Sequence, residues 1–338
     1  MAEMLEETVS AKDTRTAATP PPREDLTEIR VQGQAAWVPS AEVQGRKVIV
    51  TGKWLKIASV QDEELTEGEI VAEPASFIKR LQEGGPKADL FTFSQKLPKT
   101  TPCFSYHMEW DNLAVIPISS FEEWWEKRVD PGVRRAVRKA AKSGLVTKRA
   151  PFDDDFVAGI VSINNEARIR QGRPFWHFQK SFEDVKKENS TYAENNIFLG
   201  AYLDGDLVGF MRMTVVDKVA HIIQLLSMMK HYDKRPANAL VAKAVEVCSE
   251  EGITQLVYCN YVYNDPTSSL TEFKRRNGFE KVLVPRYYVP LSTLGKAVLF
   301  LGLHQGLAKR LPQPLVVRLL KIRNRWYSRK SQSADGAN

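Results

Sequence analysis

A hairpin with a tight turn constrains the fold of this chain more than any other feature. Two apolar runs, residues 196–202 and 207–213, are joined through Asp204-Gly205-Asp206. An Asp-Gly pair suits the left-handed backbone that a two-residue hairpin turn requires, so the two runs predict antiparallel strands. A third strand is predicted over 219–229. The second half of the chain is therefore built around a sheet.

Helical patterns precede and follow this hairpin. Residues 153–170 carry Phe156, Ile160, Ile163 and Ala167 at helical spacing, and 181–188 forms a weaker pattern. The pattern then predicts a helix over 236–251, a strand over 255–259, a helix over 270–276 and a strand over 282–290. The order from residue 152 is α-α-β-β-β-α-β-α-β. This order predicts an α/β (α+β) fold in which helices flank a mixed central sheet.

The region before this pattern contains shorter elements. Strands are predicted over 36–38, 47–51, 89–93 and 113–117, and a helix over 75–82. We expect five segments: a disordered tail (1–27), an N-terminal α/β region (28–118), a main domain (119–292), basic amphipathic C-terminal helices (293–330) and a second disordered tail (331–338).

Positive charge is concentrated in two places. The net charge of the 338-residue chain is +7, yet residues 133–149 hold seven bases and no acid, and residues 296–330 hold nine bases and no acid. Such basic patches favour polyanionic partners: tRNA, nucleotide phosphate or lipid phosphate. The alternative is a solvated run of charges. For 296–330, the alternatives are an amphipathic helix on the inner face of an anionic membrane and a helix packed onto the domain.

Several classes of protein are excluded. The three cysteines are scattered and lack metal-ligand spacing, which indicates a reducing compartment and no metal site. The N-terminus has no apolar signal core, so we expect a cytoplasmic protein. The sequence also lacks a P-loop, a Rossmann glycine fingerprint and a Ser/His/Asp signature. Kinases, dehydrogenases, metalloenzymes and hydrolases are therefore set aside.

Over about residues 115–292, the element order resembles the GNAT acyltransferase fold. Three motifs are similar to the FemAB-type branch, the aminoacyl transferases of peptidoglycan bridges and their relatives: Arg134-Arg135-Ala136-Val137-Arg138-Lys139-Ala140-Ala141-Lys142-Ser143-Gly144, Glu166-Ala167-Arg168-Ile169-Arg170-Gln171-Gly172 and Leu270-Thr271-Glu272-Phe273-Lys274-Arg275-Arg276-Asn277-Gly278-Phe279. The resemblance implies an N-acyltransferase that acts on an amine acceptor. It also implies that 28–118 is a reduced first GNAT-like half.

The resemblance places the donor beside a strand splayed from its parallel neighbour, over 222–229, with a phosphate-binding turn at 231–238 and a helix from Ala239. The donor-binding residues would be Met228, Met229, Lys234, Arg235, Ala237, Asn238 and Ala239. Ala237 occupies the position where the superfamily pattern has a glycine that lets phosphate approach the backbone. Two donors therefore stay open, acyl-CoA and aminoacyl-tRNA.

Catalytic candidates follow the second splayed strand. Tyr258 and Tyr261 could protonate the leaving group, Asn260 could donate to a carbonyl, and Glu166 could accept a proton. The alternatives are packing for the tyrosines and an exposed Glu166–Arg170 pair on one helix. Candidates for phosphate binding are Arg135, Arg138, Arg170 and Lys274, the last by family resemblance. The alternative for Lys274 is a solvated helix face. A different reading of the whole chain is a non-catalytic GNAT module that binds a polyanion or a membrane surface.

Overall fold

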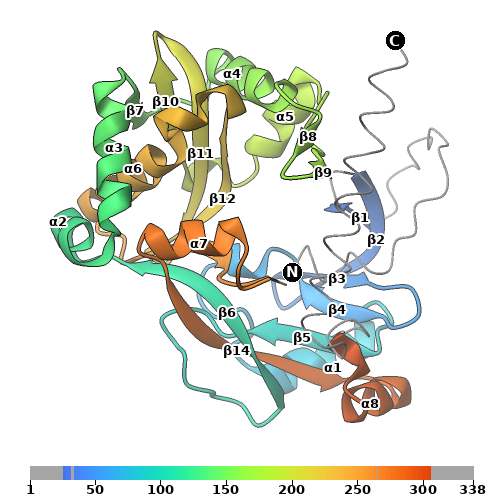
Figure 1. Cartoon of the computed structure of the whole chain (residues 1–338). Helices are drawn as coiled ribbons and strands as arrows, with labels where there is room; N and C mark the ends of the chain where they lie inside the picture. The colour runs from blue at the N-terminus through green and yellow to red at the C-terminus, as the bar shows by residue number, and fades with distance from the viewer. Residues whose placement is uncertain (1–25, 32–33, 264, 306–338) are drawn as a thin grey trace. The chain divides into compact units, whose positions relative to one another are not determined.

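The computed structural model describes residues 26–31, 34–263 and 265–305, and the chain divides into two compact units (Figure 1). Of the described residues, the first unit combines those up to Asp111 with 283–305, and the second contains those from Asn112 to Val282. The two units meet in the sequence after residues 111 and 282, before the predicted boundaries at 118 and 292. Both positions fall within strands, because β6 (His107–Pro117) and β14 (Glu280–Pro290) each contribute residues to both units.

The first unit contains a mixed sheet in the order β1-β2-β3-β4-β5-β14. Its remaining strands are β1 (Leu26–Val31), β2 (Gln34–Val43), β3 (Arg46–Thr51), β4 (Ile57–Val60) and β5 (Leu90–Ser94). Neighbours are antiparallel except β4 and β5, which are parallel and joined through η1 (Glu63–Leu65) and α1 (Pro74–Gly84). Strand β1 begins at Leu26, inside the segment predicted as a disordered tail.

Aromatic side chains fill the core of the first unit. Phe77 of α1 stacks on Phe91 with ring centroids 5.3 Å apart, and Phe91 stacks on Phe93 at 5.5 Å. Tyr287 of β14 lies 5.3 Å from Phe93 and is fully buried. The C-terminal part of the described chain, α8 (Thr293–Phe300) and η5 (Leu303–Gln305), belongs to this unit. The predicted basic helices beyond residue 305 lie outside the described residues.

The second unit has the sheet order β6-β13-β12-β11-β10-β7. Its strands are β7 (Val146–Arg149), β10 (Asn196–Leu203), β11 (Asp206–Val216), β12 (Val219–Ser227) and β13 (Gln255–Asn260), besides β6. The predicted hairpin is confirmed as β10 and β11, with Asp204 and Gly205 both at positive φ in the turn. Strands β12 and β13 are the parallel pair, connected through a helix.

Helices flank this sheet, as the sequence predicts. They are α2 (Phe121–Glu123) with the π-helical turn η2 (Trp124–Arg128), α3 (Pro131–Lys142), α4 (Asp154–Asn165), α5 (Phe182–Asn189), α6 (Pro236–Glu250) and α7 (Ser269–Arg276), with short turns η3 (Ala193–Asn195) and η4 (Met229–Lys234). Figure 1 shows α3 and α6 on one side of the sheet and α4 and α5 on the other. Asp153, Ser181 and Ser268 accept backbone N–H groups at the starts of α4, α5 and α7.

One predicted helix was too long. The helix predicted over 153–170 ends at Asn165, and the chain then forms a small hairpin of β8 (Ile169–Arg170) and β9 (Arg173–Pro174). Gln171 and Gly172 form its turn, both at positive φ, at 52° and 75°. Glycine tolerates this backbone, and the two-residue turn reverses the chain in place of another helical turn.

Candidate active site

The parallel strands β12 and β13 separate at one end. They pair at three positions, Val219 with Gln255, Ala220 with Leu256 and His221 with Val257. Beyond these pairs β12 continues to Ser227 and β13 to Asn260, without further pairing between them in the described chain. A register shift between Val257 and Asn260 and a positive φ at Cys259 bend β13 there. The sheet therefore opens at the C-terminal ends of two parallel strands, a common position for ligands.

The turn that follows β12 is held by a carboxylate. Glu166 accepts the backbone N–H of Met229 at 2.6 Å and that of Lys230 at 2.9 Å. Arg170 lies 3.3 Å from the same carboxylate and donates to the carbonyls of Ser227 and Ile163 at 2.8 and 2.7 Å. The side chains of Glu166 and Arg170 are 16% and 9% exposed.

The pair predicted from the spacing of Glu166 and Arg170 thus forms, but not on one helix and not in solvent. Arg170 lies on β8, and its described hydrogen bonds go to Glu166 and to backbone carbonyls. In this structure, Arg170 holds the end of β12 in place, and its role in phosphate binding stays a prediction.

Helix α6 starts where the sequence pattern predicts it, three residues before the Ala239 start that the family resemblance implies. Its first residue is Pro236, and Arg235, at φ 60°, precedes it without a side-chain cap. The N–H of Ala239 donates to the carbonyl of Arg235 at 3.2 Å, so that amide is used within the helix. The half-buried Ala237 and Asn238 occupy the first turn, where backbone N–H groups have no intrahelical partner.

The other predicted donor-binding side chains surround this turn. Met228 is buried, whereas Met229 is 40% exposed. Lys234 lies 3.6 Å from Asp233, and Arg235 is exposed. The Asn238 side chain donates to the buried Asn277 at 3.1 Å and so connects the start of α6 with the end of α7. Sequence reasoning missed Asn277, although it lies inside the third motif.

A buried lysine lies at the end of β13. Lys274 is 0% exposed, and its Nζ donates to the carbonyl of Asn260 at 2.5 Å. The Nζ atom is 4.7 Å from the centre of the Tyr258 ring and 4.9 Å from that of the Tyr263 ring. The alternative of a solvated helix face is therefore wrong for Lys274. It is the inward-facing cation of that helix, and its charge interacts with two aromatic faces.

The predicted catalytic residues therefore fall into two groups. Tyr258 and Asn260 lie at the end of β13, where they meet Lys274, the residue predicted to bind phosphate, while Glu166 meets the turn after β12. Burial raises the pKa of Tyr258, so its hydroxyl keeps its proton at neutral pH. Tyr261 is half-buried against the core, and its backbone N–H donates to the carbonyl of Asn112 at 2.9 Å. Tyr263 also contacts Lys274, and the sequence analysis did not select this residue.

The basic helix predicted before this domain is α3. Its exposed side chains Arg135, Arg138, Lys139 and Lys142 recur at helical spacing and share one face. In the described part of the chain, none of these four forms an ion pair. Arg138 also lies 5.9 Å from the ring centre of Trp125. This arrangement gives a face of positive charge that is not neutralised by neighbouring acids.

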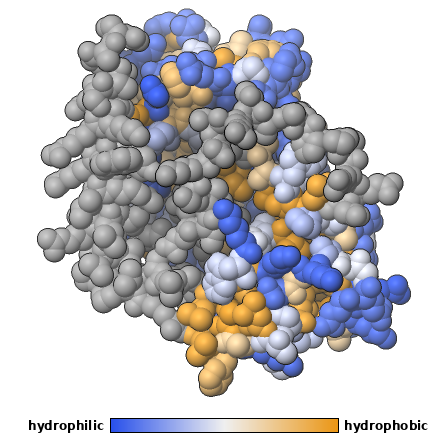
Figure 2. All heavy atoms as spheres, turned by 90° about the vertical axis from the view of Figure 1, so that its right-hand side faces the viewer, coloured by the Kyte–Doolittle hydropathy of each residue, from blue (hydrophilic) through white to orange (hydrophobic). Residues whose placement is uncertain are grey.

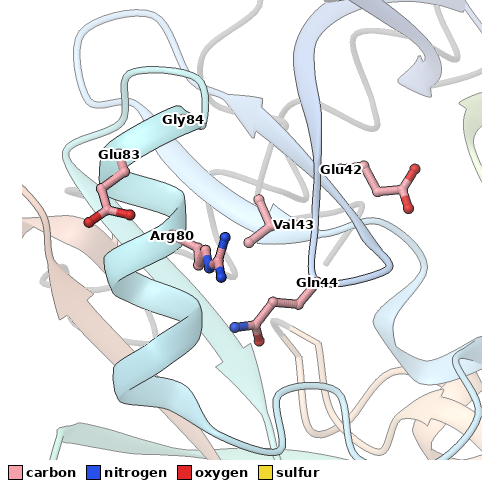
Figure 3. Close-up of a pocket in the computed structure, with 6 residues that line it drawn as sticks. All are labelled: Glu42, Val43, Gln44, Arg80, Glu83 and Gly84. Atoms are coloured by element: carbon pink, nitrogen blue, oxygen red, sulfur yellow. The ribbon is translucent and has the colours of Figure 1, made fainter.

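Each of the two units contains a pocket. A pocket of about 400 Å³ in the second unit is lined by residues of the β10–β11 turn, α4 and the segment after β12, including Met228, Lys230 and His231. The Nδ1 atom of His231 is buried without a hydrogen-bond partner in the described chain. A second pocket, of about 560 Å³, lies in the first unit between α1 and the β2–β3 turn. In Figure 3, Arg80 and Gln44 point into it and Glu42 points away. None of the predicted site residues lines it.

Comparison with known proteins supports the fold. Residues 164–279 match the family model described as the acetyltransferase (GNAT) family. The matched segment includes α6, β12, β13 and α7, so the opened strand pair lies within the part of the chain that is similar to this family. No sequence among curated proteins matches the chain.

Solved structures with a similar fold cover most of the chain. The C-terminal domain of a putative lysylphosphatidylglycerol synthetase from Agrobacterium fabrum has 14% identity and a TM-score of 0.50, covering 79% of this chain and 88% of its own. The L-PGS structure from Bacillus licheniformis has 13% identity and a TM-score of 0.51, covering 80% and 89%. FemX has 10% identity and a TM-score of 0.52, covering 78% and 88%. At these identities the likeness establishes the fold alone, and it confirms the predicted GNAT architecture.

Proposed function

We propose that this protein is a GNAT-fold N-acyltransferase that moves an aminoacyl group from an aminoacyl-tRNA donor to an amine acceptor. The observation that carries the proposal is the separation of β12 and β13 beside the buried Lys274. The open strand edges offer backbone groups to an extended donor, and the lysine supplies a positive charge in a site of low polarity.

The chemistry requires a neutral amine to attack the carbonyl carbon of the donor ester. A C–N bond forms, the carbonyl oxygen becomes negative, and the C–O bond to the ribose then breaks. The Lys274 cation would stabilise this developing negative charge. The Tyr258 hydroxyl, which keeps its proton at neutral pH, would protonate the departing ribose oxygen, and its phenolate would then take up the proton that the attacking amine loses.

Glu166 has a different role in this proposal. Its carboxylate is engaged by the amides of Met229 and Lys230 and by Arg170. These contacts occupy both oxygens of the carboxylate. Glu166 therefore fixes the turn after β12 and orders the donor site, while proton transfer occurs at the end of β13.

Three observations favour aminoacyl-tRNA over acyl-CoA. The Glu166 carboxylate already occupies two amides after β12, so these amides are not free to bind a pyrophosphate. The Ala239 amide is used within the helix, and Ala237 adds a side chain where the superfamily pattern has glycine. The exposed basic face of α3 is a surface for an RNA backbone, which a small cofactor does not need.

Donor binding tests the proposal. We expect fluorescence anisotropy to show binding of aminoacyl-tRNA, with an affinity that falls steeply as salt rises from about 50 to 200 mM. Coenzyme A and acetyl-CoA should not raise the melting temperature at saturating concentration. The paired change Arg135→Glu with Arg138→Glu should weaken tRNA binding and flatten its salt dependence. The matched control, Lys47→Glu with Lys79→Glu, reverses two exposed lysines of the first unit and should leave binding unchanged.

The outcomes separate the alternatives. A melting-temperature increase with acyl-CoA and no binding of tRNA would refute the donor assignment and leave the acyltransferase fold with a coenzyme A donor. Equal binding of aminoacylated and deacylated tRNA, without transfer to any amine, would instead favour a non-catalytic module that binds polyanions.

A further inference from the structure

Two histidines and a glutamate from distant parts of the sequence converge in the first unit. His107 and Glu109 are two residues apart on β6, so their side chains share one face of that strand. His304 comes from η5, near the end of the described chain. Its Nε2 lies 2.6 Å from Glu109 Oε1, and the Nε2 of His107 lies 3.5 Å from the same oxygen. One ligand atom from each residue falls within 4.8 Å of the others.

The three side chains differ in their exposure to solvent. The side chain of His304 is 1% exposed, that of Glu109 is 20% exposed and that of His107 is 45% exposed. The two imidazole rings are nearly perpendicular, with centroids 5.4 Å apart, and Tyr288 packs on His304 at 4.8 Å. The group is therefore anchored on one side by a buried ring and open to solvent on the other.

We propose that His107, Glu109 and His304 form a binding site for a zinc ion, with its fourth position open to water. Imidazole and carboxylate are ligands that zinc accepts, and two histidines with one glutamate form a known type of three-ligand zinc site. Ligand atoms at about 2.0–2.2 Å from zinc lie roughly 3–4 Å from one another. The Nε2 of the exposed His107 already lies at such a distance from Glu109 Oε1, 3.5 Å.

The chemistry of the buried pair supports a cation. His304 Nε2 forms a hydrogen bond with Glu109 Oε1 at 2.6 Å, and the His304 Nδ1 atom is buried without a hydrogen-bond partner in the described chain. Nothing else described on this ring therefore fixes its orientation by hydrogen bonding. Zinc requires a neutral imidazole and an ionised carboxylate, so its binding would displace the proton of this hydrogen bond.

Such an ion would connect the C-terminal segment to β6. Two of its ligands lie on the strand, and the third follows α8. The sequence gives no sign of this site because its ligands are separated by almost two hundred positions and follow no motif.

Zinc titration of the full-length protein tests the site. The protein is treated with EDTA, exchanged into buffer and titrated calorimetrically with ZnCl₂ at pH 7.5 and 5.5. We expect one zinc per chain at pH 7.5 and weaker binding at pH 5.5, because the imidazoles are then protonated. Replacement of zinc by Co²⁺ should give visible absorption bands of a nitrogen- and oxygen-ligated ion.

Matched variants make the test specific. His107→Ala and His304→Ala should each weaken binding by at least about tenfold. His177→Ala removes another imidazole near a glutamate, 3.9 Å from Glu188, and should bind zinc as the wild type does. His304→Ala can affect folding, whereas the exposed His107→Ala should keep the wild-type circular dichroism spectrum in EDTA. The proposal fails if the wild type binds no zinc, or if His107→Ala binds it with unchanged affinity.

Discussion

Lys274 is the residue on which the proposed chemistry depends most. A lysine with no exposed surface needs partners that replace its water, and here a carbonyl oxygen and two aromatic faces surround it. The neighbouring Arg275, by contrast, is exposed and paired with Glu272 at 2.7 Å. The same short helix therefore carries a buried charge and a solvated one.

The contrast between these two cations gives the first prediction. Lys274→Met keeps the length and removes the charge, so it should lower kcat/KM for acyl transfer by roughly 10- to 100-fold. The free energy of unfolding should change by less than about 2 kcal/mol, because apolar groups of similar volume often replace buried charges at little cost. Arg275→Met is the control and should retain activity. Comparable activity in both variants would exclude Lys274 from catalysis.

Glu166 gives the second prediction, which separates an anchor from a general base. In Glu166→Gln one amide of the β12 turn loses its acceptor, at a cost of about 1–3 kcal/mol of unfolding free energy. As an anchor, Glu166 should affect KM for the donor more than kcat, and the acidic limb of the pH–rate profile should survive the change. Loss of that acidic limb, with a large fall in kcat, would identify Glu166 as the base.

Sequence reasoning located these residues better than it described their surroundings. The spacing of Glu166 and Arg170 predicted their contact, but the helix that was meant to carry both ends at Asn165. Lys274 was identified through a motif. Its burial depends on contacts with Tyr258 on β13 and with Tyr263 after this strand. A local sequence pattern does not reveal contacts between residues so far apart in the chain.

At the scale of elements, α3 shows how a basic helix is held in place. Its N-cap is Asp130, whose carboxylate accepts the N–H of Gly132 at 2.7 Å and pairs with Arg276 of α7 at 3.1 Å. The Gly132 hydrogen bond, followed by the Arg276 contact, lowers the pKa of Asp130 below its ordinary value of 3.8. Both contacts favour the ionised carboxylate.

The third prediction follows from the sign of that shift. A carboxyl group whose pKa is lower in the folded state stabilises the fold above its unfolded pKa, and this contribution disappears as the pH falls through the folded pKa. Wild-type stability should therefore decrease below about pH 4 by a component that Asp130→Asn lacks, since asparagine also caps helices. Urea unfolding of both proteins between about pH 2.5 and 7 measures it. Parallel pH curves would show that Asp130 contributes nothing through its charge.

The order of elements was predictable because periodicity and turn residues act locally. The hairpin, α6, β13, α7 and β14 all occur close to their predicted positions. The short strands β1, β4 and β7 were missed, since four to six residues carry little periodic signal. The separation of β12 from β13 followed from family resemblance and not from any pattern within either strand.

At the scale of the molecule, the two units share an arrangement of strands. In each, a parallel pair joined through a helix is flanked on both sides by antiparallel neighbours: β4, α1 and β5 in the first unit, and β12, α6 and β13 in the second. This parallel supports the proposal that the first unit is a reduced GNAT-like half. No helix in the described part of the chain has the length and apolar character to cross a membrane.

The fourth prediction concerns a membrane surface. Apolar side chains gather in the lower part of the face shown in Figure 2, and α8 with the residue after it exposes Leu294, Phe300 and Leu301, with Phe300 at 90% exposure. Residues 296–330, which overlap the end of α8 and follow it in the sequence, contain nine bases and no acid. We propose peripheral binding to anionic lipid, because apolar insertion and charge attraction act together.

Liposome flotation measures this binding. Full-length protein should float with anionic vesicles at low salt and less at high salt, and Phe300→Ser should reduce the floated fraction. Trp54→Ser, which removes another exposed aromatic side chain of the first unit, serves as the control. Flotation that is equal with neutral vesicles, or unaffected by Phe300→Ser, would contradict membrane binding through α8.

The central claim is transfer of an aminoacyl group to an amine, and a label-transfer assay tests it most directly. Purified protein is incubated with aminoacyl-tRNA labelled in the amino acid and with primary amines that include lysyl peptides. An amide survives mild alkali, whereas the donor ester does not. The account predicts alkali-stable label in the amine fraction, absent with deacylated tRNA and strongly reduced in Lys274→Met. Label that moves only from acyl-CoA, or alkali-stable product formed equally by Lys274→Met, would contradict it.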